Sequence, residues 1–227
     1  MKEQDKARLI DRYQSRLAQF GAVPAAIGEP KQRQRFYFHF LLDSPEFSTS
    51  RSLLDVGCGY GDLEEYLRQA GWSGRYTGID IVPAIVEAAH TLRPEVDIRL
   101  LDLEIDTLEE HFDWVTSIGV LTGKTTEIDY YSYLESMLGK MWERSLRGVS
   151  FNLFSPYVDF QHPVHAHPDM GKVIEIVRKF SRRFAIRNDF MPYEYAVYVY
   201  RDDAVTRELS IFSAHQSCFD KVCRSAD

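Results

Sequence analysis

The sequence predicts an α/β fold: a doubly wound, mostly parallel, seven-stranded sheet with N-terminal helices and a C-terminal antiparallel hairpin. Three observations lead to this prediction. From residue 51 onward, short apolar segments alternate with patterns of helical period. The first apolar segment ends in three closely spaced glycines, Gly57, Gly59 and Gly61, and the second ends on an acid, Asp80. Such alternation is typical of parallel sheets that carry helices on both faces.

Two helices are expected before the sheet, in an N-terminal helical cap that comprises residues 1–50. Apolar residues at helical spacing predict the first helix over residues 3–20, and Gly21 ends it. Residues 22–30 are expected to form a loop. An aromatic-rich second helix is predicted from Lys31 to about Leu42, and the pair Ser44-Pro45 breaks it.

Residues 51–202 are expected to form the sheet domain. Strands are predicted at residues 52–56, 75–79, 96–101, 112–117, 148–154, 185–190 and 195–200. Helices are predicted at residues 62–69, 83–92, 130–144 and 169–180, with a weak turn near Leu108. The last two strands are close enough in sequence to pair as an antiparallel hairpin at one edge. Two alternatives are open for the polar tail, residues 203–227: a short docked helix or a disordered segment.

The strand, glycine turn and helix of residues 53–69 predict a site for an adenosine-containing cofactor. Glycines let the backbone turn sharply and approach a ligand, and the acid after the next strand can accept hydrogen bonds from ribose hydroxyls. In the dinucleotide fingerprint G-x-G-x-x-G, a pyrophosphate lies at the helix N-terminus. Here the pattern is G-x-G-x-G, and Asp62 stands in place of the third fingerprint glycine. A carboxylate there would repel a pyrophosphate and tolerate a cationic ligand.

The segment Asp55-Val-Gly-Cys-Gly-Tyr-Gly61 resembles motif I of class I S-adenosylmethionine-dependent methyltransferases, and Ile79-Asp80-Ile81 is similar to their second motif. The resemblance covers roughly residues 51–121, and beyond them only the order of elements agrees. It implies a Rossmann-like sheet and S-adenosylmethionine as the cofactor. The residues that it assigns to the cofactor are Asp55, Gly57, Cys58, Gly59, Gly61, Asp80, Ile81, Asp102, Leu103, Ser117 and Arg35.

The same resemblance implies a role for each assigned residue. The glycine loop, with the small side chain of Cys58 inside it, would lie under the methionine part of the cofactor. Asp80 would bind the ribose, Ile81 would flank the adenine, and Asp102 with Leu103 would meet the adenine amino edge. For Asp102 a second role is open, as a cap of the segment that follows it. Residues 117–120 would border the methyl-transfer site, and Arg35 could pair with the methionine carboxylate. For Asp55 two roles are open, contact with the ligand or bracing of the glycine loop through backbone amides.

Three histidines, His162, His165 and His167, follow the fifth predicted strand and are the candidates for a general base. Methyl transfer requires alignment, a dry site and a nucleophile with a free lone pair, and a base is needed when the acceptor is a hydroxyl or an ammonium. Neutral imidazoles can accept that proton near pH 7. A surface loop or a substrate lid with incidental histidines is the alternative. The H-x-H spacing without further partners is weak evidence for a metal site.

Composition limits the partners and the compartment. The formal net charge of -7 disfavours a nucleic-acid partner, and the best candidate for a basic face is the segment from Arg178 to Arg183. No apolar run is long enough to span a membrane. Three scattered cysteines and a charged N-terminus favour a reducing cytoplasm over secretion.

These observations lead to one functional hypothesis and two alternatives. The hypothesis is an S-adenosylmethionine-dependent methyltransferase that acts on an oxygen or nitrogen atom of a small molecule. The first alternative is a protein or RNA methyltransferase that uses the basic segment. The second is a non-catalytic module that binds S-adenosylmethionine and acts through a partner. The sequence names neither the acceptor nor the oligomeric state.

Overall fold

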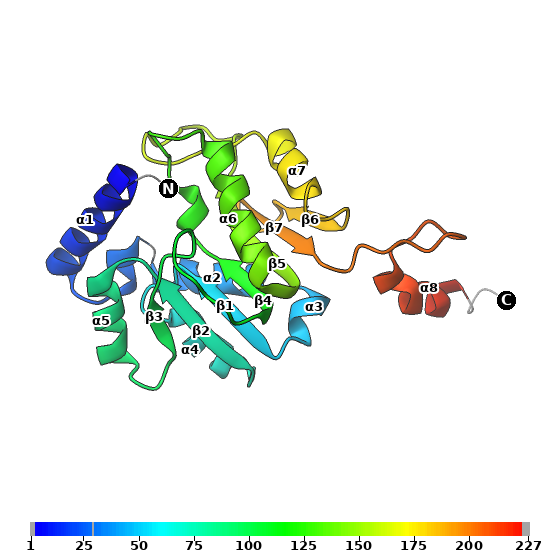
Figure 1. Cartoon of the computed structure of the whole chain (residues 1–227), viewed down its shortest axis with the longest axis horizontal. Coiled ribbons are helices and arrows are strands. Elements are labelled where there is room, and N and C mark those ends of the chain that lie inside the picture. Colours follow the sequence, from blue (N-terminus) through cyan, green and yellow to red (C-terminus); the bar gives the residue numbers. More distant parts are fainter. Residues whose placement is uncertain (1–2, 29, 224–227) are drawn as a thin grey trace.

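The computed structural model describes residues 3–28 and 30–223 and contains one seven-stranded sheet, shown in Figure 1. The strand order is β3-β2-β1-β4-β5-β7-β6. Neighbouring strands from β3 to β5 are parallel, whereas β7 pairs antiparallel with both β5 and β6. The strands are β1 (Ser52–Val56), β2 (Arg75–Asp80), β3 (Ile98–Leu100), β4 (Phe112–Ser117), β5 (Ser145–Phe154), β6 (Phe184–Arg187) and β7 (Glu194–Tyr200). The predicted doubly wound, Rossmann-like fold is therefore confirmed.

Helices cover both faces of this sheet because successive strand residues point to opposite sides. Leu54 and Val115 belong to the apolar cluster of α6 (Tyr130–Arg144) and α7 (Met170–Arg178). Leu53 and Trp114 belong to the opposite cluster, which contains side chains of α2 (Lys31–Leu41), α4 (Asp62–Gln69) and α5 (Pro83–Leu92). Among the described residues, no helix is long and apolar enough to cross a bilayer.

The N-terminal segment forms α1 (Glu3–Phe20) and α2, as predicted, together with two short elements that were not expected. A 3-10 turn, Pro24–Ile27, lies within the predicted loop. A short helix, α3 (Pro45–Ser48), begins at the residue pair that was interpreted only as a helix break. The Ser44 hydroxyl accepts the Phe47 amide hydrogen at 3.1 Å, so this serine caps the next helix.

Strand boundaries differ from the prediction where a helix or turn joins the strand directly. β5 begins at Ser145 instead of residue 148, because α6 runs into it without a loop and Ser145 pairs with Phe112 across an irregularity in the ladder. β3 is shorter than predicted, since the Val96 amide is bonded within a turn to the Arg93 carbonyl. β6 ends at Arg187, before the predicted residue 190.

The tail carries a helix, α8 (Gln216–Cys223), that lies away from the sheet in Figure 1. None of its residues is buried. The helical alternative for the tail is thus correct over these residues, but the helix is not docked on the sheet. The last four residues of the predicted tail, 224–227, lie outside the described residues.

Gly148 on β5 provides a test of the sheet packing. A Cβ at this position would lie 2.5 Å from Trp114 Cζ3 and 2.7 Å from the Val199 carbonyl oxygen. We expect Gly148→Ala to lower the free energy of unfolding by about 1–3 kcal/mol, because the contact on the carbonyl side cannot move aside. Gly139→Ala on α6 is the matched control: its Cβ would meet nothing closer than 3.8 Å, and we expect a gain of roughly 0.5–1 kcal/mol. Urea unfolding of both variants measures their free energies of unfolding. If Gly148→Ala changed this free energy no more than Gly139→Ala does, the packing around Gly148 would be contradicted.

Candidate cofactor and acceptor site

A cavity of about 530 Å³ lies at the carboxyl ends of the parallel strands. Ligands of doubly wound folds bind in this position, and the volume is within the roughly 300–1,000 Å³ of small-molecule sites. Its wall is formed by the ends of β1, β2 and β5, by residues 101–104 after β3 and 118–120 after β4, and by parts of α1 and α2. The predicted site residues that line it are Asp55, Gly57, Cys58, Gly59, Asp80, Ile81, Asp102, Leu103 and His165.

The turn after β1 requires glycine for both conformation and space. Gly57 and Gly59 have φ of 76° and 56°, in the left-handed region. A Cβ on Gly57 would lie 2.1 Å from Val120 Cγ2. The amides of Gly57 and Cys58 both donate to the Ile79 carbonyl, at 2.8 and 3.0 Å. Gly61 does not line the cavity and is instead the N-cap of α4.

Asp80 ends β2 and fixes the turn from the opposite side. One carboxylate oxygen accepts the Gly59 amide hydrogen at 3.1 Å, and the other accepts that of Val82 at 2.9 Å. Burial raises the pKa of Asp80, and the hydrogen bonds from the two amides oppose this rise. Each carboxylate oxygen has two acceptor positions, so hydrogen-bond capacity remains on the cavity side.

Asp55 is buried, and its carboxylate accepts the Tyr76 hydroxyl hydrogen at 2.7 Å. Burial raises the pKa of Asp55 to about 7, the Tyr76 bond opposes this, and the charges of Asp80 and Asp62 add to it. The amides of the glycine turn are bonded to Ile79 and Asp80, as described above. The structure therefore does not support the role in which Asp55 braces the turn through those amides.

Asp102 lines the cavity and has a partner that the sequence did not suggest. Its Oδ2 lies 2.8 Å from Lys6 Nζ of α1, and its Oδ1 accepts the Glu104 amide hydrogen at 3.0 Å. The hydrogen bond to Asp102 raises the pKa of Lys6. The residue predicted at the adenine edge is thus joined to the N-terminal helix.

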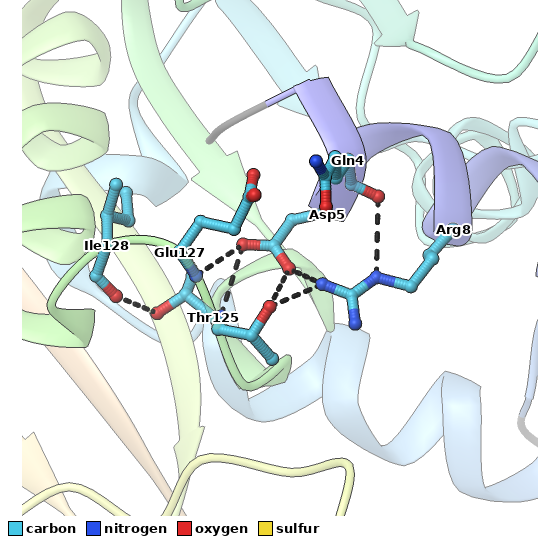
Figure 2. A network of polar contacts seen from close by, with 7 residues as sticks. Gln4, Asp5, Arg8, Thr125, Glu127 and Ile128 are labelled. Carbon is cyan, nitrogen blue, oxygen red and sulfur yellow. Dashed lines mark hydrogen bonds and ion pairs between the residues drawn. The ribbon is translucent and has the colours of Figure 1, made fainter.

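A second contact, shown in Figure 2, joins α1 to the segment before α6. The buried Asp5 carboxylate accepts hydrogen bonds from the Thr126 hydroxyl at 2.7 Å and from the amides of Thr126 and Glu127 at 3.1 and 3.3 Å. Arg8 donates to Asp5 and to the Thr126 hydroxyl. Burial acts to raise the pKa of Asp5, but these hydrogen bonds and the Arg8 charge outweigh it and lower the pKa. These four residues, the Asp5 cluster, fix α1 against residues 126 and 127.

Another chain of side chains at the cavity wall starts from the turn after β4. The Gly119 amide donates to Asn152 Oδ1 at 2.8 Å, and Asn152 Nδ2 donates to Glu194 at 3.0 Å. Arg33 of α2 forms an ion pair with the same carboxylate. Sequence reasoning missed Asn152 and Glu194. Both lie in apolar strand segments, where only the observed sheet order shows that they meet.

Ser117 does not line the cavity, contrary to the prediction. It is buried in β4, and its hydroxyl donates to the Val56 carbonyl at 3.1 Å. Residues 118–120 lie at the wall instead. The Ser117 side chain is used within the sheet, and the residues that follow it reach the cavity wall in its place.

Of the three candidate histidines, only His165 lines the cavity. Its ring centre lies 4.6 Å from that of Phe154. Burial lowers the pKa of His165, and His162, Arg12 and His167 lower it further, so the imidazole is neutral near pH 7. His162 is exposed, and His167 Nδ1 lies 2.8 Å from the Ser155 carbonyl. The prediction of a base at these two positions is not supported. Among the described residues, no group of three His, Cys, Asp or Glu side chains could hold a metal ion.

Arg35 lies outside the cavity wall, with its guanidinium over the Tyr66 ring, 5.2 Å from the centroid. Gln34 and Tyr37 of the same helix line the cavity instead, since they share one face three residues apart. Gln34 Nε2 donates to Asp62 at 3.3 Å, and its buried Oε1 has no hydrogen-bond partner within the described chain. Helical periodicity could have separated Gln34 from Arg35.

Comparisons with known sequences are consistent with this geometry. Residues 30–123 match the family described as a methyltransferase domain. A Mycobacterium tuberculosis protein named as a methyltransferase, Rv1506c, is 30% identical over 158 residues, which are 65% of this chain and 92% of the relative. The ubiquinone biosynthesis O-methyltransferase of Hydrogenovibrio crunogenus is 40% identical over 78 residues, 32% of each chain.

Solved structures share the fold at low sequence identity. The magnesium protoporphyrin IX methyltransferase of Synechocystis PCC 6803 with bound SAH gives a TM-score of 0.62 at 18% identity, covering 87% of this chain and 99% of that one. The amino pentose methyltransferase CalS10 of Micromonospora echinaspora gives 0.58 at 14% identity, covering 76% and 92%.

The raised pKa of Asp55 makes a prediction for stability. An ordinary Asp titrates near pH 4, so ionisation of the folded-state carboxyl up to pH 7 opposes folding. This penalty is absent below about pH 4, grows as the pH rises, and is complete above pH 7. We compare the free energy of unfolding of Asp55→Asn with that of the native protein at pH 5 and at pH 8. We expect the difference to shift in favour of Asp55→Asn by about a few kcal/mol at the higher pH, as linkage between ionisation and folding requires.

Urea unfolding at the two pH values measures this change. Asp189→Asn is the control, because Arg187 lowers the pKa of that carboxyl and its ionisation does not oppose folding. A stability difference between Asp55→Asn and the native protein that does not change with pH would contradict the raised pKa.

Proposed function

The chain belongs to the family of S-adenosylmethionine-dependent methyltransferases, and we propose that its methyl acceptor is an oxygen or nitrogen atom of a small molecule. The observation that carries this proposal is a single covered cavity. Its wall contains the glycine turn and Asp80 as well as His165 and Glu194. Cofactor and acceptor would meet in this one cavity, which α1 also lines.

The residues of the cofactor end fit S-adenosylmethionine. Asp80 would accept hydrogen bonds from the ribose hydroxyls, while Ile81 and Leu103 provide apolar surface for the adenine. Gly57 and Gly59 line the cavity, and their backbone would lie next to the methionine part. The unpartnered Gln34 Oε1 is a suitable acceptor for the methionine ammonium group.

When bound, S-adenosylmethionine supplies a methyl group on a sulfonium, which is already a strong electrophile. The residues of this chain then need to align the acceptor, exclude water and take up a proton. Leu9 and Tyr13 of α1 cover the cavity with apolar surface, and the Asp5 cluster holds that helix in place. His165 is neutral and lies at the wall, so it can accept the proton that a hydroxyl or amine loses.

The basic segment near α7 gives little support to a nucleic-acid acceptor. Lys179 is paired with Glu135, Arg182 with Asp203, and the buried Arg183 with Glu46. Side chains paired in this way are already neutralised, so they are poor ligands for a phosphate backbone. The covered cavity likewise favours an acceptor small enough to be enclosed.

Replacement of Asp80 tests the cofactor end. We expect Asp80→Ala to weaken binding of S-adenosylmethionine and S-adenosylhomocysteine by roughly 1–3 kcal/mol, the cost of losing hydrogen bonds to a charged group. Calorimetry measures this, with the exposed Glu143→Ala on α6 as the control. Unchanged affinity in a folded variant would remove Asp80 from the site. Tight binding of NAD, with neither sulfur ligand bound, would contradict the cofactor assignment.

The acceptor class is tested with radiolabelled S-adenosylmethionine. We expect label to pass to members of a panel of small alcohols, phenols and amines, and not to added RNA or protein. His165→Asn should lower kcat by about 10²-fold or more, the usual contribution of a general base, with unchanged S-adenosylmethionine affinity. His162→Asn, at an exposed position of the same loop, is the control. Label found in RNA or protein, with none in the small molecules, would overturn the proposal.

A further inference from the structure

Glu194 is a buried carboxylate that the proposed reaction does not yet use. It is the first residue of β7, its exposed fraction is 1%, and it lines the cavity. Its backbone position is fixed by the β5–β7 ladder, where it pairs with Phe154, and by Asn188 Nδ2, which donates to its carbonyl at 2.7 Å. A carboxylate in such a place is costly unless it is paired and hydrogen-bonded.

Two neighbours compensate the Glu194 charge without using all of its hydrogen-bond capacity. Arg33 donates to Oε1 and Asn152 Nδ2 donates to Oε2. Each carboxylate oxygen can accept two hydrogen bonds, so one position on each oxygen remains. The side chain is therefore held in one orientation and can still accept a hydrogen bond from a ligand in the cavity.

Asn152 connects Glu194 to the turn after β4, which would border the methyl-transfer site. Asn152 Oδ1 accepts the Gly119 amide hydrogen, which fixes the amide so that its nitrogen points to Glu194. The next residue, Val120, fills the space that a Cβ on Gly57 would occupy. Asn152 therefore links Glu194 to the turn after β4, at the point where that turn packs against the glycine turn.

Phe154 places Glu194 and His165 at the same part of the cavity. Phe154 lies opposite Glu194 in the ladder, and directly paired residues of antiparallel strands project from the same face. The Phe154 ring also packs against His165. An apolar ring, a hydrogen-bond acceptor and a neutral base therefore border one compartment, which suits a carbon body with an O–H or N–H group.

We propose that Glu194 determines the acceptor class: it accepts a hydrogen bond from a hydroxyl or amine and excludes carboxylate and phosphate groups from this compartment. The inference rests on the proposed function and deepens it. An O–H or N–H group, whether neutral or an ammonium, gains a hydrogen bond to Glu194, whereas an anion meets a buried like charge at close range. Alcohols, phenols and amines are then acceptors, and carboxylic acids are not.

Three probes of one shape test this selection: benzyl alcohol, benzylamine and benzoate, each added to the protein loaded with S-adenosylhomocysteine. Ligand-observed NMR titration gives their affinities. We expect benzyl alcohol and benzylamine to bind at least tenfold more tightly than benzoate. Glu194→Gln should reduce this ratio at least tenfold, because it removes the negative charge and keeps the shape. Glu46→Gln is the matched control, since Glu46 also pairs with an arginine but lies outside the cavity wall.

A second variant keeps the test informative should Glu194→Gln fail to fold. Arg33 is half exposed and does not line the cavity. Arg33→Met keeps Glu194 but removes the cation that is paired with its carboxylate, so the negative charge in the cavity is less well compensated. We expect it to increase the preference for benzylamine over benzyl alcohol at least threefold. An unchanged preference would overturn the inference.

The remaining outcomes separate this inference from the proposed function. Calorimetry with S-adenosylhomocysteine is performed on every variant, and its affinity should stay within twofold of the native value. Suppose that S-adenosylhomocysteine binds normally, but that benzoate binds as tightly as benzyl alcohol or that none of the probes binds. Either result overturns the role of Glu194 and leaves the proposed function intact. Failure of the native protein to bind S-adenosylhomocysteine overturns the proposed function, and the inference with it.

Discussion

The arrangement of the whole site depends on the contact between the glycine turn and the end of β2. Asp80 accepts one amide from the turn and one from the start of α5, and the Ile79 carbonyl accepts two more amides from the turn. These bonds hold β1, β2 and α5 in one fixed relation. Because Gly57 has no Cβ, the turn after β4 can approach as well, with Val120 in the space left free. Three strand ends are thereby brought around one cavity.

The N-terminal helices complete the cavity through charged pairs that join distant parts of the chain. Lys6 pairs with Asp102, Asp5 with residues 126 and 127, and Arg33 with Glu194. Each of these contacts connects α1 or α2 to a loop or strand end of the sheet. The apolar face of α1 would supply the dry environment, and the charged pairs determine where that helix lies. Water exclusion over the cavity would therefore depend on these ionic contacts.

Local pattern explains which features could be predicted from the sequence. Strand and helix periods, the glycine spacing and the acid after β2 are all encoded within short segments, and they led to the sheet, the turn and Asp80. Arg35, Ser117, His162 and His167 were assigned by proximity in sequence to correct elements. The direction of each side chain from its element then excluded it from the cavity wall. Asn152, Glu194 and Lys6 depend on strand order and on helix docking, which no local pattern specifies.

The carboxylates around the cavity differ in how their charge is compensated, and this difference bears on the order of events at the site. Asp5, Asp102 and Glu194 each have a cationic partner on α1 or α2. Within the described residues, Asp55 and Asp80 have only neutral donors, the Tyr76 hydroxyl and backbone amides.

The uncompensated pair lies at the glycine turn, where a cationic ligand would gain the most. S-adenosylmethionine carries a sulfonium charge that its product lacks. If the cofactor binds beside the glycine turn, these carboxylates would attract it more strongly than the product. The same electrostatic arrangement would then favour exchange of the product for a fresh cofactor molecule.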